Sequence, residues 1–102
     1  MKDVDIRQLR WNDWNIEHIG RPGHEATQDE VEEIVASEHS FGQIQPNGRI
    51  FVLGITTQGR YLATVIDPEV DGIWYCVSAR TASKKERIRY HQERAKRRPT
   101  DE

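Results

Sequence analysis

The sequence contains a single cysteine, Cys76, and no apolar run long enough to cross a membrane. One cysteine cannot form an intramolecular disulfide, and a membrane-spanning helix needs about 20 mainly apolar residues. The first eleven residues, MKDVDIRQLRW, lack the continuous apolar segment of a secretory signal peptide. These absences predict a cytoplasmic protein of a reducing compartment that does not enter a membrane.

The chain is also short, and it shows no internal repeat and no low-complexity segment. Its 102 residues, of which 35% are hydrophobic, suffice for one domain with a thin core. We expect this single domain over residues 1–98. Pro99 should end the last helix, and residues 99–102 should form a disordered tail.

The net charge of −2 hides a strong separation of charge along the chain. Residues 1–79 carry six basic and thirteen acidic side chains, a net charge of −7. Residues 80–98 carry nine basic and two acidic side chains, a net charge of +7. Such a separation indicates a polyanionic ligand, an acidic protein partner, or pairing of the two halves with each other.

Two helices are expected in the first part of the chain. Residues 12–20 place apolar and aromatic side chains at helical spacing behind Asn12, a plausible N-cap. Thr27 and Glu30 have the spacing of a capping box, and an apolar face of Val31, Ile34 and Val35 follows. Residues 4–11 allow a short strand before these helices, and residues 38–48 are expected to form a loop.

Three strands and a final helix are expected in the second part. Residues 49–56, 60–67 and 73–79 are rich in β-branched and aromatic side chains and are joined by short turns, which predicts an antiparallel meander. Ser83 and Glu86 form a second capping box, opening a helix over residues 84–97. The order β-α-α-β-β-β-α defines an α+β fold with a basic C-terminal helix.

This last helix has few apolar side chains. Ile88, Ala95 and the ring of Tyr90 are the only candidates for a buried stripe. A stripe this narrow stabilises by only a few kcal/mol, at roughly 25 cal/mol per Å² of buried apolar area. Most of the helix should therefore face water.

Three blocks of the sequence resemble the BrnT family of toxins, which belong to bacterial type II toxin–antitoxin pairs. The closing block of that family reads (S/T)-A-R-x-x-(S/T)-x-x-E-R-x-x-Y, and the chain matches it at every defined position: Ser78, Ala79, Arg80, Ser83, Glu86, Arg87 and Tyr90. The middle block is matched by Gly59, Arg60, Tyr61 and Leu62, and the opening block by Trp11, Asn15, Glu30 and Val31. His24 corresponds to the histidine of the family's K-H-G-V segment.

The resemblance implies a RelE-like fold and an endoribonuclease that cleaves RNA without a metal or another cofactor. It also implies a cognate antitoxin, a ribbon-helix-helix DNA-binding protein, that forms a hetero-oligomer with the toxin and neutralises it. The alternative is a weak or inactive RelE-like protein that only binds a protein partner or the ribosome. The acidic total charge and the altered RPGH loop, residues 21–24, motivate that alternative.

Cleavage of RNA by its own 2′-hydroxyl requires a proton acceptor, cations at the pentacovalent phosphate and a proton donor for the leaving oxygen. The candidate catalytic residues are Arg60, Arg80, Tyr90, Glu86 and His24. Arg60 and Arg80 stand at strand ends that a meander brings together. They would form a phosphate clamp, or alternatively bridge to the acidic helix at Glu30–Glu33.

The remaining candidates each have a plain structural explanation beside the catalytic one. Glu86 could be a general base, but its place in the capping box is sufficient explanation. Tyr90 could contact RNA or anchor the helix. The candidate RNA-binding residues are Lys84, Lys85, Arg87 and Arg89, which could equally form a solvated face.

The histidines, tryptophans and cysteine also have structural explanations. His24, a catalytic candidate, and His18 could titrate near neutral pH, but a single histidine is more often structural. His91 is expected on the solvent face of the last helix without a role. Trp11 and Trp14 are expected in the core, and Cys76 is expected to be a packed thiol. The four histidines lack further ligands at suitable spacing, so no metal site is predicted.

Overall fold

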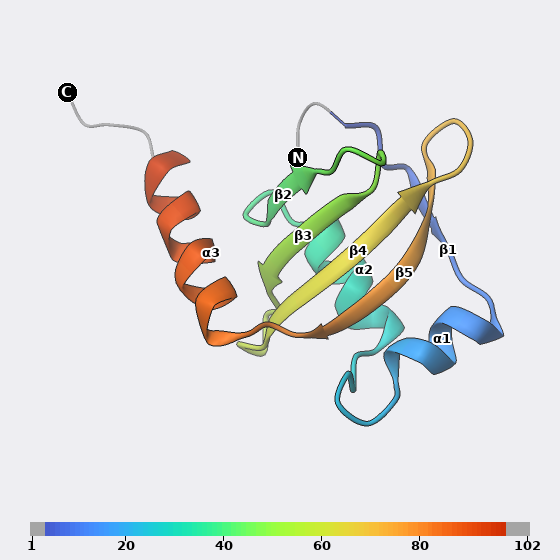
Figure 1. Ribbon diagram of the computed structural model, residues 1–102, viewed down its shortest axis with the longest axis horizontal. Coiled ribbons are helices and arrows are strands. Elements are labelled where there is room, and N and C mark those ends of the chain that lie inside the picture. The colour runs from blue at the N-terminus through green and yellow to red at the C-terminus, as the bar shows by residue number, and fades with distance from the viewer. Residues whose placement is uncertain (1–3, 98–102) are drawn as a thin grey trace.

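The computed structural model describes residues 4–97, which form three helices around one sheet of five strands (Figure 1). The elements in chain order are β1 (Gln8–Arg10), α1 (Asp13–Ile19), α2 (Gln28–Ala36), β2 (Phe41–Ile44), β3 (Ile50–Ile55), β4 (Tyr61–Pro68), β5 (Ile73–Thr81) and α3 (Lys84–Arg97). The predicted α+β class is therefore confirmed. The expected tail, residues 99–102, lies outside the described residues.

The sheet has the strand order β1-β5-β4-β3-β2. The predicted meander is confirmed for β3, β4 and β5, which pair antiparallel to one another. Two expectations need correction. β1 runs parallel to β5, so the sheet is mixed. The expected loop at residues 38–48 contains β2, which pairs antiparallel with β3.

The additional strand depends on its partner rather than on its own sequence. Phe41–Ile44 reads FGQI, with a glycine and no alternation of polar and apolar residues. Its strand geometry comes from the hairpin to β3, which closes at Gly48 with a φ angle of 88°. Positive φ of this kind is readily available only to glycine. Tertiary pairing therefore overrides a weak local preference.

All three predicted N-caps form. In α1, the Asn15 backbone N–H donates to the Asn12 side chain over 3.0 Å, and Asn15 caps in return. In α2, the Glu30 N–H donates to the Thr27 hydroxyl and the Thr27 N–H donates to the Glu30 carboxylate. Ser83 and Glu86 make the same reciprocal pair at the start of α3. Each cap satisfies backbone donors that the helix cannot.

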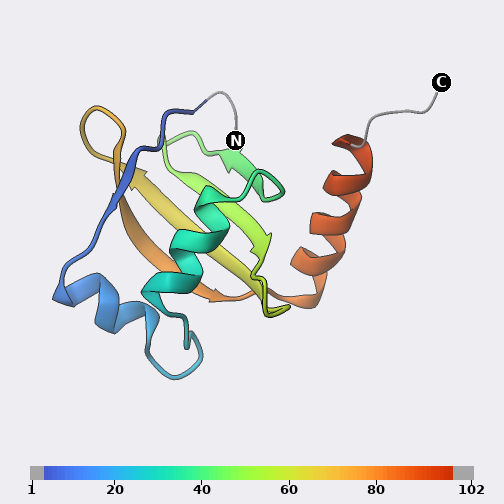
Figure 2. The same ribbon diagram turned by 180° about the vertical axis from the view of Figure 1, so that it is seen from behind.

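The two faces of the sheet carry separate hydrophobic clusters. The larger cluster joins α1 and α2 to the sheet, and its fully buried members include Ile19, Val31 and Ile34. Figure 2 shows α2 lying across this face of the sheet. The close approach of α2 depends on Gly54, because a Cβ atom there would stand 2.9 Å from the Cβ of Ile34.

The smaller cluster lies on the opposite face and holds α3. Leu53, Ala63, Ala82 and Tyr90 are its buried members, and Tyr90 is the only buried residue of α3. Ile88 is 49% exposed and Ala95 is exposed, so the expected three-residue stripe is wrong. The expectation that most of this helix faces water is correct.

Trp11 packs against the larger cluster as expected, but Trp14 is 56% exposed. The prediction of a core position for Trp14 is therefore wrong. The helix turns Asn15 and Ile19 inward instead. The Asn15 side chain donates to the carbonyls of Arg10 and Cys76, which ties α1 to β1 and β5.

Within the described residues, no helix is both long and apolar enough to cross a membrane.

Candidate functional site

Arg60 is a structural bridge at the start of β4. Its guanidinium donates to the Glu30 carboxylate over 2.7 Å and to the backbone carbonyls of Glu25 and His24. A fourth bond, over 2.9 Å, goes to the Thr81 hydroxyl. The arginine therefore joins β4, the end of β5, α2 and the loop before α2. This is the predicted alternative in which a strand-end arginine bridges to the acidic helix.

Arg60 and Arg80 do not form the predicted clamp. The two strand ends meet as expected, because Leu62 pairs with Thr81 and Ala63 pairs with Arg80. Successive side chains of a strand point to opposite faces. Arg60 therefore lies on the α2 side of the sheet, and Arg80 lies on the α3 side. The clamp prediction is wrong because the two strand ends meet but their arginine side chains point to opposite faces of the sheet.

Arg80 instead forms a two-bond ion pair with Glu86. Its two terminal nitrogens donate to the two carboxylate oxygens over 2.7 and 2.8 Å. This pairing, together with the Ser83 N–H bond, lowers the pKa of the Glu86 carboxyl from 4.5 to about 2. The same hydrogen bond raises the pKa of Arg80. A carboxylate with so low a pKa is a weak proton acceptor, which favours the capping role over that of a general base.

The Arg80 guanidinium is held in position by Glu86 but remains partly exposed to solvent. Its side chain remains 42% exposed, while that of Glu86 is 20% exposed. A guanidinium held by one carboxylate keeps donor capacity for a second oxyanion. Arg80 can therefore still contact a phosphate.

Tyr90, one helical turn after Glu86, is the buried anchor of α3. It is 6% exposed, and its ring meets that of Tyr61 edge-on with centroids 6.2 Å apart. Such edge-to-face pairs stabilise beyond the area that they bury. The structure thus supports the anchoring role of Tyr90.

Tyr61 and His91 form a close polar pair beside this anchor. The Tyr61 hydroxyl and the His91 Nε2 atom are 2.6 Å apart, and His91 is exposed as predicted. The Arg87 guanidinium carbon lies 5.5 Å from the centre of the Tyr61 ring. Neither Tyr61 nor His91 is among the catalytic residues that the sequence predicts. The signal that could have identified Tyr61 is the alternation of β4, which places Tyr61 and Ala63 on the same sheet face as Arg80.

The four predicted RNA-binding residues, Lys84, Lys85, Arg87 and Arg89, are all exposed on α3. Across residues 4–97, none of the four forms an ion pair with an acidic side chain. The ion pairs of residues 80–97 are Arg80–Glu86 and Lys96–Glu93, both internal to that segment. Pairing between the acidic and basic parts of the chain, one of the three predicted explanations for the charge separation, does not occur among the described residues.

His24 lies on the other side of the sheet from Arg80. Its ring is 5.2 Å from that of His18, which in turn stacks on Trp14 with centroids 4.9 Å apart. The Nδ1 atoms of both histidines are buried without a hydrogen-bond partner among the described residues. His24 thus packs with α1, and only its carbonyl contacts Arg60.

Residues 4–97 contain no group of three or more histidine, cysteine or acidic side chains that could hold a metal ion. Cys76 is buried, as predicted, and burial raises the pKa of its thiol to about 11. Such a thiol is protonated and unreactive at neutral pH.

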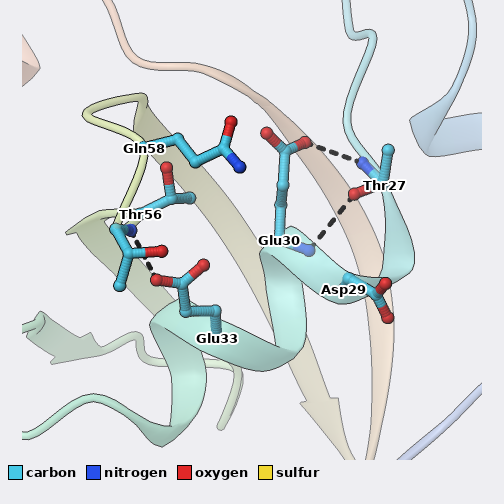
Figure 3. A pocket seen from close by; sticks show the side chains of 7 residues that line it. Thr27, Asp29, Glu30, Glu33, Thr56 and Gln58 are labelled. Atoms are coloured by element: carbon cyan, nitrogen blue, oxygen red, sulfur yellow. Dashed lines mark hydrogen bonds between the residues drawn. The ribbon is translucent and has the colours of Figure 1, made fainter.

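A shallow cavity of about 290 Å³ lies between α2 and the turn from β3 to β4 (Figure 3). Asp29, Glu30 and Glu33 line it, and Thr27, Thr56, Thr57 and Gln58 complete the wall. Figure 3 shows Glu30 engaged in its capping box and Glu33 accepting a bond from the turn, which is the Thr57 backbone N–H. An acidic cavity repels phosphate, so we place the candidate site on the α3 side of the sheet.

Comparison with known proteins adds no assignment: no family model matches the chain, and no curated protein sequence is significantly similar to it.

Proposed function

We propose that this protein is an RNA-cleaving toxin of the BrnT type, with a RelE-like fold, that acts without a metal and is neutralised by a cognate antitoxin. The observation that carries the proposal is the exposed positive charge at the start of α3. Lys84, Lys85, Arg87 and Arg89 have no acidic partner among residues 4–97. A segment with this much uncompensated charge binds a polyanion or an acidic protein surface.

The surroundings of these residues support RNA as the polyanion. Arg87 lies over the ring of Tyr61, and Arg80 is opposite Ala63 on the same face of the sheet, so guanidinium groups and an aromatic ring share one surface. Single-stranded RNA is commonly bound by cations along its backbone and by aromatic or arginine planes against its bases. The partly exposed Arg80, held in place by Glu86, would orient one phosphate through paired hydrogen bonds.

The antitoxin is the second proposed partner. An acidic segment of a cognate antitoxin would cover the same cations, and RNA would then be excluded by direct competition. The sequence blocks around Arg80 and Tyr90 support this assignment through their resemblance to BrnT toxins. The strand pairs β3–β4 and β4–β5, followed by a helix, are compatible with a RelE-like topology.

The test combines growth with biochemistry. Expression of the chain alone should arrest bacterial growth, and co-expression with the product of its neighbouring gene should restore growth. The purified protein should cleave RNA in the presence of EDTA. Arg80→Ala should abolish toxicity. Arg49→Ala serves as the matched control, because Arg49, just before β3, is also a partly exposed arginine in an ion pair, in this case with Asp67. Normal growth together with intact RNA would refute the proposal.

The binding role without cleavage remains the second candidate, and two observations favour it. The terminal nitrogens of Arg60 donate four hydrogen bonds within the fold, and the Glu86 carboxyl has a pKa of about 2. Two of the predicted catalytic groups are thus occupied. RNA or ribosome binding with normal affinity and no cleavage would identify this case.

A further inference from the structure

We infer that Tyr61 and His91 are the proton-transferring pair of the proposed ribonuclease site. This inference depends on the proposed function and deepens it, because the predicted general base, Glu86, is held in an ion pair. The site then needs another proton acceptor at neutral pH. The structure offers an imidazole and a phenol in direct contact, 2.6 Å apart, on the same side of the sheet as Arg80.

Strand register brings this pair close to the cations. Arg80 is opposite Ala63, and Tyr61 lies two residues from Ala63 on the same face of β4. Diagonal neighbours of this kind in an antiparallel pair are about 7–8 Å apart. Arg87 lies over the Tyr61 ring from the helix. A phosphate bound between Arg80 and Arg87 would therefore be adjacent to the Tyr61 hydroxyl.

The charged and titratable groups around the pair come from α3 and β4. Arg87 is one helical turn before His91, and Tyr90 touches its ring with centroids 5.4 Å apart. From β4 the facing group is Tyr61 itself, and the nearby carboxylate of Glu86 is neutralised by Arg80. One turn further along α3, Arg94 contacts His39, which lies just before β2.

The proton transfer starts with the Tyr61 hydroxyl donating to the unprotonated Nε2 atom of His91. The 2′-hydroxyl of RNA gives its proton to the Tyr61 oxygen, while the phenol proton moves to Nε2 and produces an imidazolium. The 2′ oxygen bonds to phosphorus, and the bond from phosphorus to the 5′ oxygen breaks. The 5′ oxygen takes a proton from water, and the resulting hydroxide takes the proton back from the imidazolium. Arg80 and Arg87 stabilise the extra negative charge at phosphorus.

The experiment measures cleavage of mixed-sequence single-stranded RNA by the full chain, with a 2′-deoxy strand as the unreactive probe. His91→Gln and Tyr61→Phe should each lower kcat by about 10²-fold or more, the usual contribution of general acid–base catalysis, with KM unchanged. The wild-type rate should fall on the acid side with the titration of an imidazole, and His91→Gln should lose this dependence. Products should end in a 2′,3′-cyclic phosphate.

Matched controls are available on the same molecule. His39→Gln and Tyr75→Phe change the same residue types outside the pair. His39 lies just before β2 and contacts Arg94, and Tyr75 lies in β5 and contacts Asn12. Both should cleave at the wild-type rate. Circular dichroism would verify that His91→Gln, a substitution at an exposed helical position, keeps its fold.

The outcomes separate this inference from the proposed function. If wild type cleaves RNA and both pair variants cleave equally fast, the pair has no catalytic role and the ribonuclease assignment stands. If wild type binds RNA but leaves it intact, both the ribonuclease assignment and the catalytic pair are overturned. Loss of kcat in both variants, together with the lost acid limb, supports the pair.

Discussion

Replacing Glu86 by glutamine should destabilise α3 and remove most of its sensitivity to acid. Glutamine keeps the size of the side chain but loses the negative charge that Arg80 contacts through two hydrogen bonds. It also weakens the acceptor of the Ser83 N–H in the capping box. The ion pair joins α3 to Arg80 near the end of β5, and the cap stabilises the start of α3. The substitution weakens both interactions.

The magnitude follows from the pKa of the Glu86 carboxyl, which falls from 4.5 to about 2 in the folded protein. A shift of this size corresponds to roughly 3 kcal/mol of differential stabilisation at 1.36 kcal/mol per unit. Because Arg80 is 42% exposed, solvent screening reduces the expected loss to about 1–2 kcal/mol. For a domain of this size, that corresponds to a fall in Tm of roughly 4–16 °C.

The pH dependence has a definite sign. The folded pKa of Glu86 lies below its unfolded value, so the unfolded chain binds a proton first as the pH falls. The stabilisation is therefore complete above about pH 4.5 and is lost as the pH falls towards about 2. Wild-type α3 should lose stability over that window, and Glu86→Gln should lose much less.

The assay is urea unfolding at neutral and acid pH, followed by circular dichroism and by amide hydrogen exchange in residues 84–97. A double-mutant cycle with Arg80→Gln isolates the interaction between the two side chains. A coupling energy below about 0.3 kcal/mol would refute the reasoning, since errors of additivity reach that size. So would an acid response of Glu86→Gln equal to that of wild type.

Three further predictions concern the two hydrophobic clusters. Tyr90→Ala should destabilise α3 by about 3 kcal/mol because it removes the helix's buried anchor, whereas the exposed Ile88→Ala should change stability by less than about 0.5 kcal/mol; hydrogen exchange of α3 compares the two. Gly54→Ala should cost about 1–3 kcal/mol in urea unfolding because the new methyl group would crowd Ile34, and a neutral result would contradict the close packing. Cys76, with a thiol pKa of about 11, should react with a thiol reagent only in denaturant; rapid labelling of the native protein would contradict its burial.

Local signals in the sequence were sufficient for the elements that stabilise themselves. The three capping motifs, at Asn12, Thr27 and Ser83, depend on residues three positions apart and formed as predicted. The three central strands have strong β-branched patterns and short turns, and these also formed. Such elements need little information from the rest of the chain.

Features that depend on distant partners were missed. Phe41–Ile44 becomes a strand because β3 is beside it, and β1 pairs parallel with β5, from which two helices and three strands separate it in the chain. The clamp failed for a similar reason, since strand ends can be predicted more easily than the faces of their side chains. Whether Tyr61 and His91 meet depends on the angle at which α3 leaves the sheet, and no local pattern contains that angle.

Because the two hydrophobic clusters lie on opposite faces of the sheet, substitutions on the α3 side affect different contacts from those under α1 and α2. The larger one packs α1 and α2 against the sheet, and it shares no side chain with the basic surface of α3. Residues such as Lys84, Lys85 and Arg89 can therefore change without disturbing that cluster. Exposed residues of α3 can therefore be substituted as a binding partner changes in sequence, while the sheet and its larger hydrophobic cluster keep their structure.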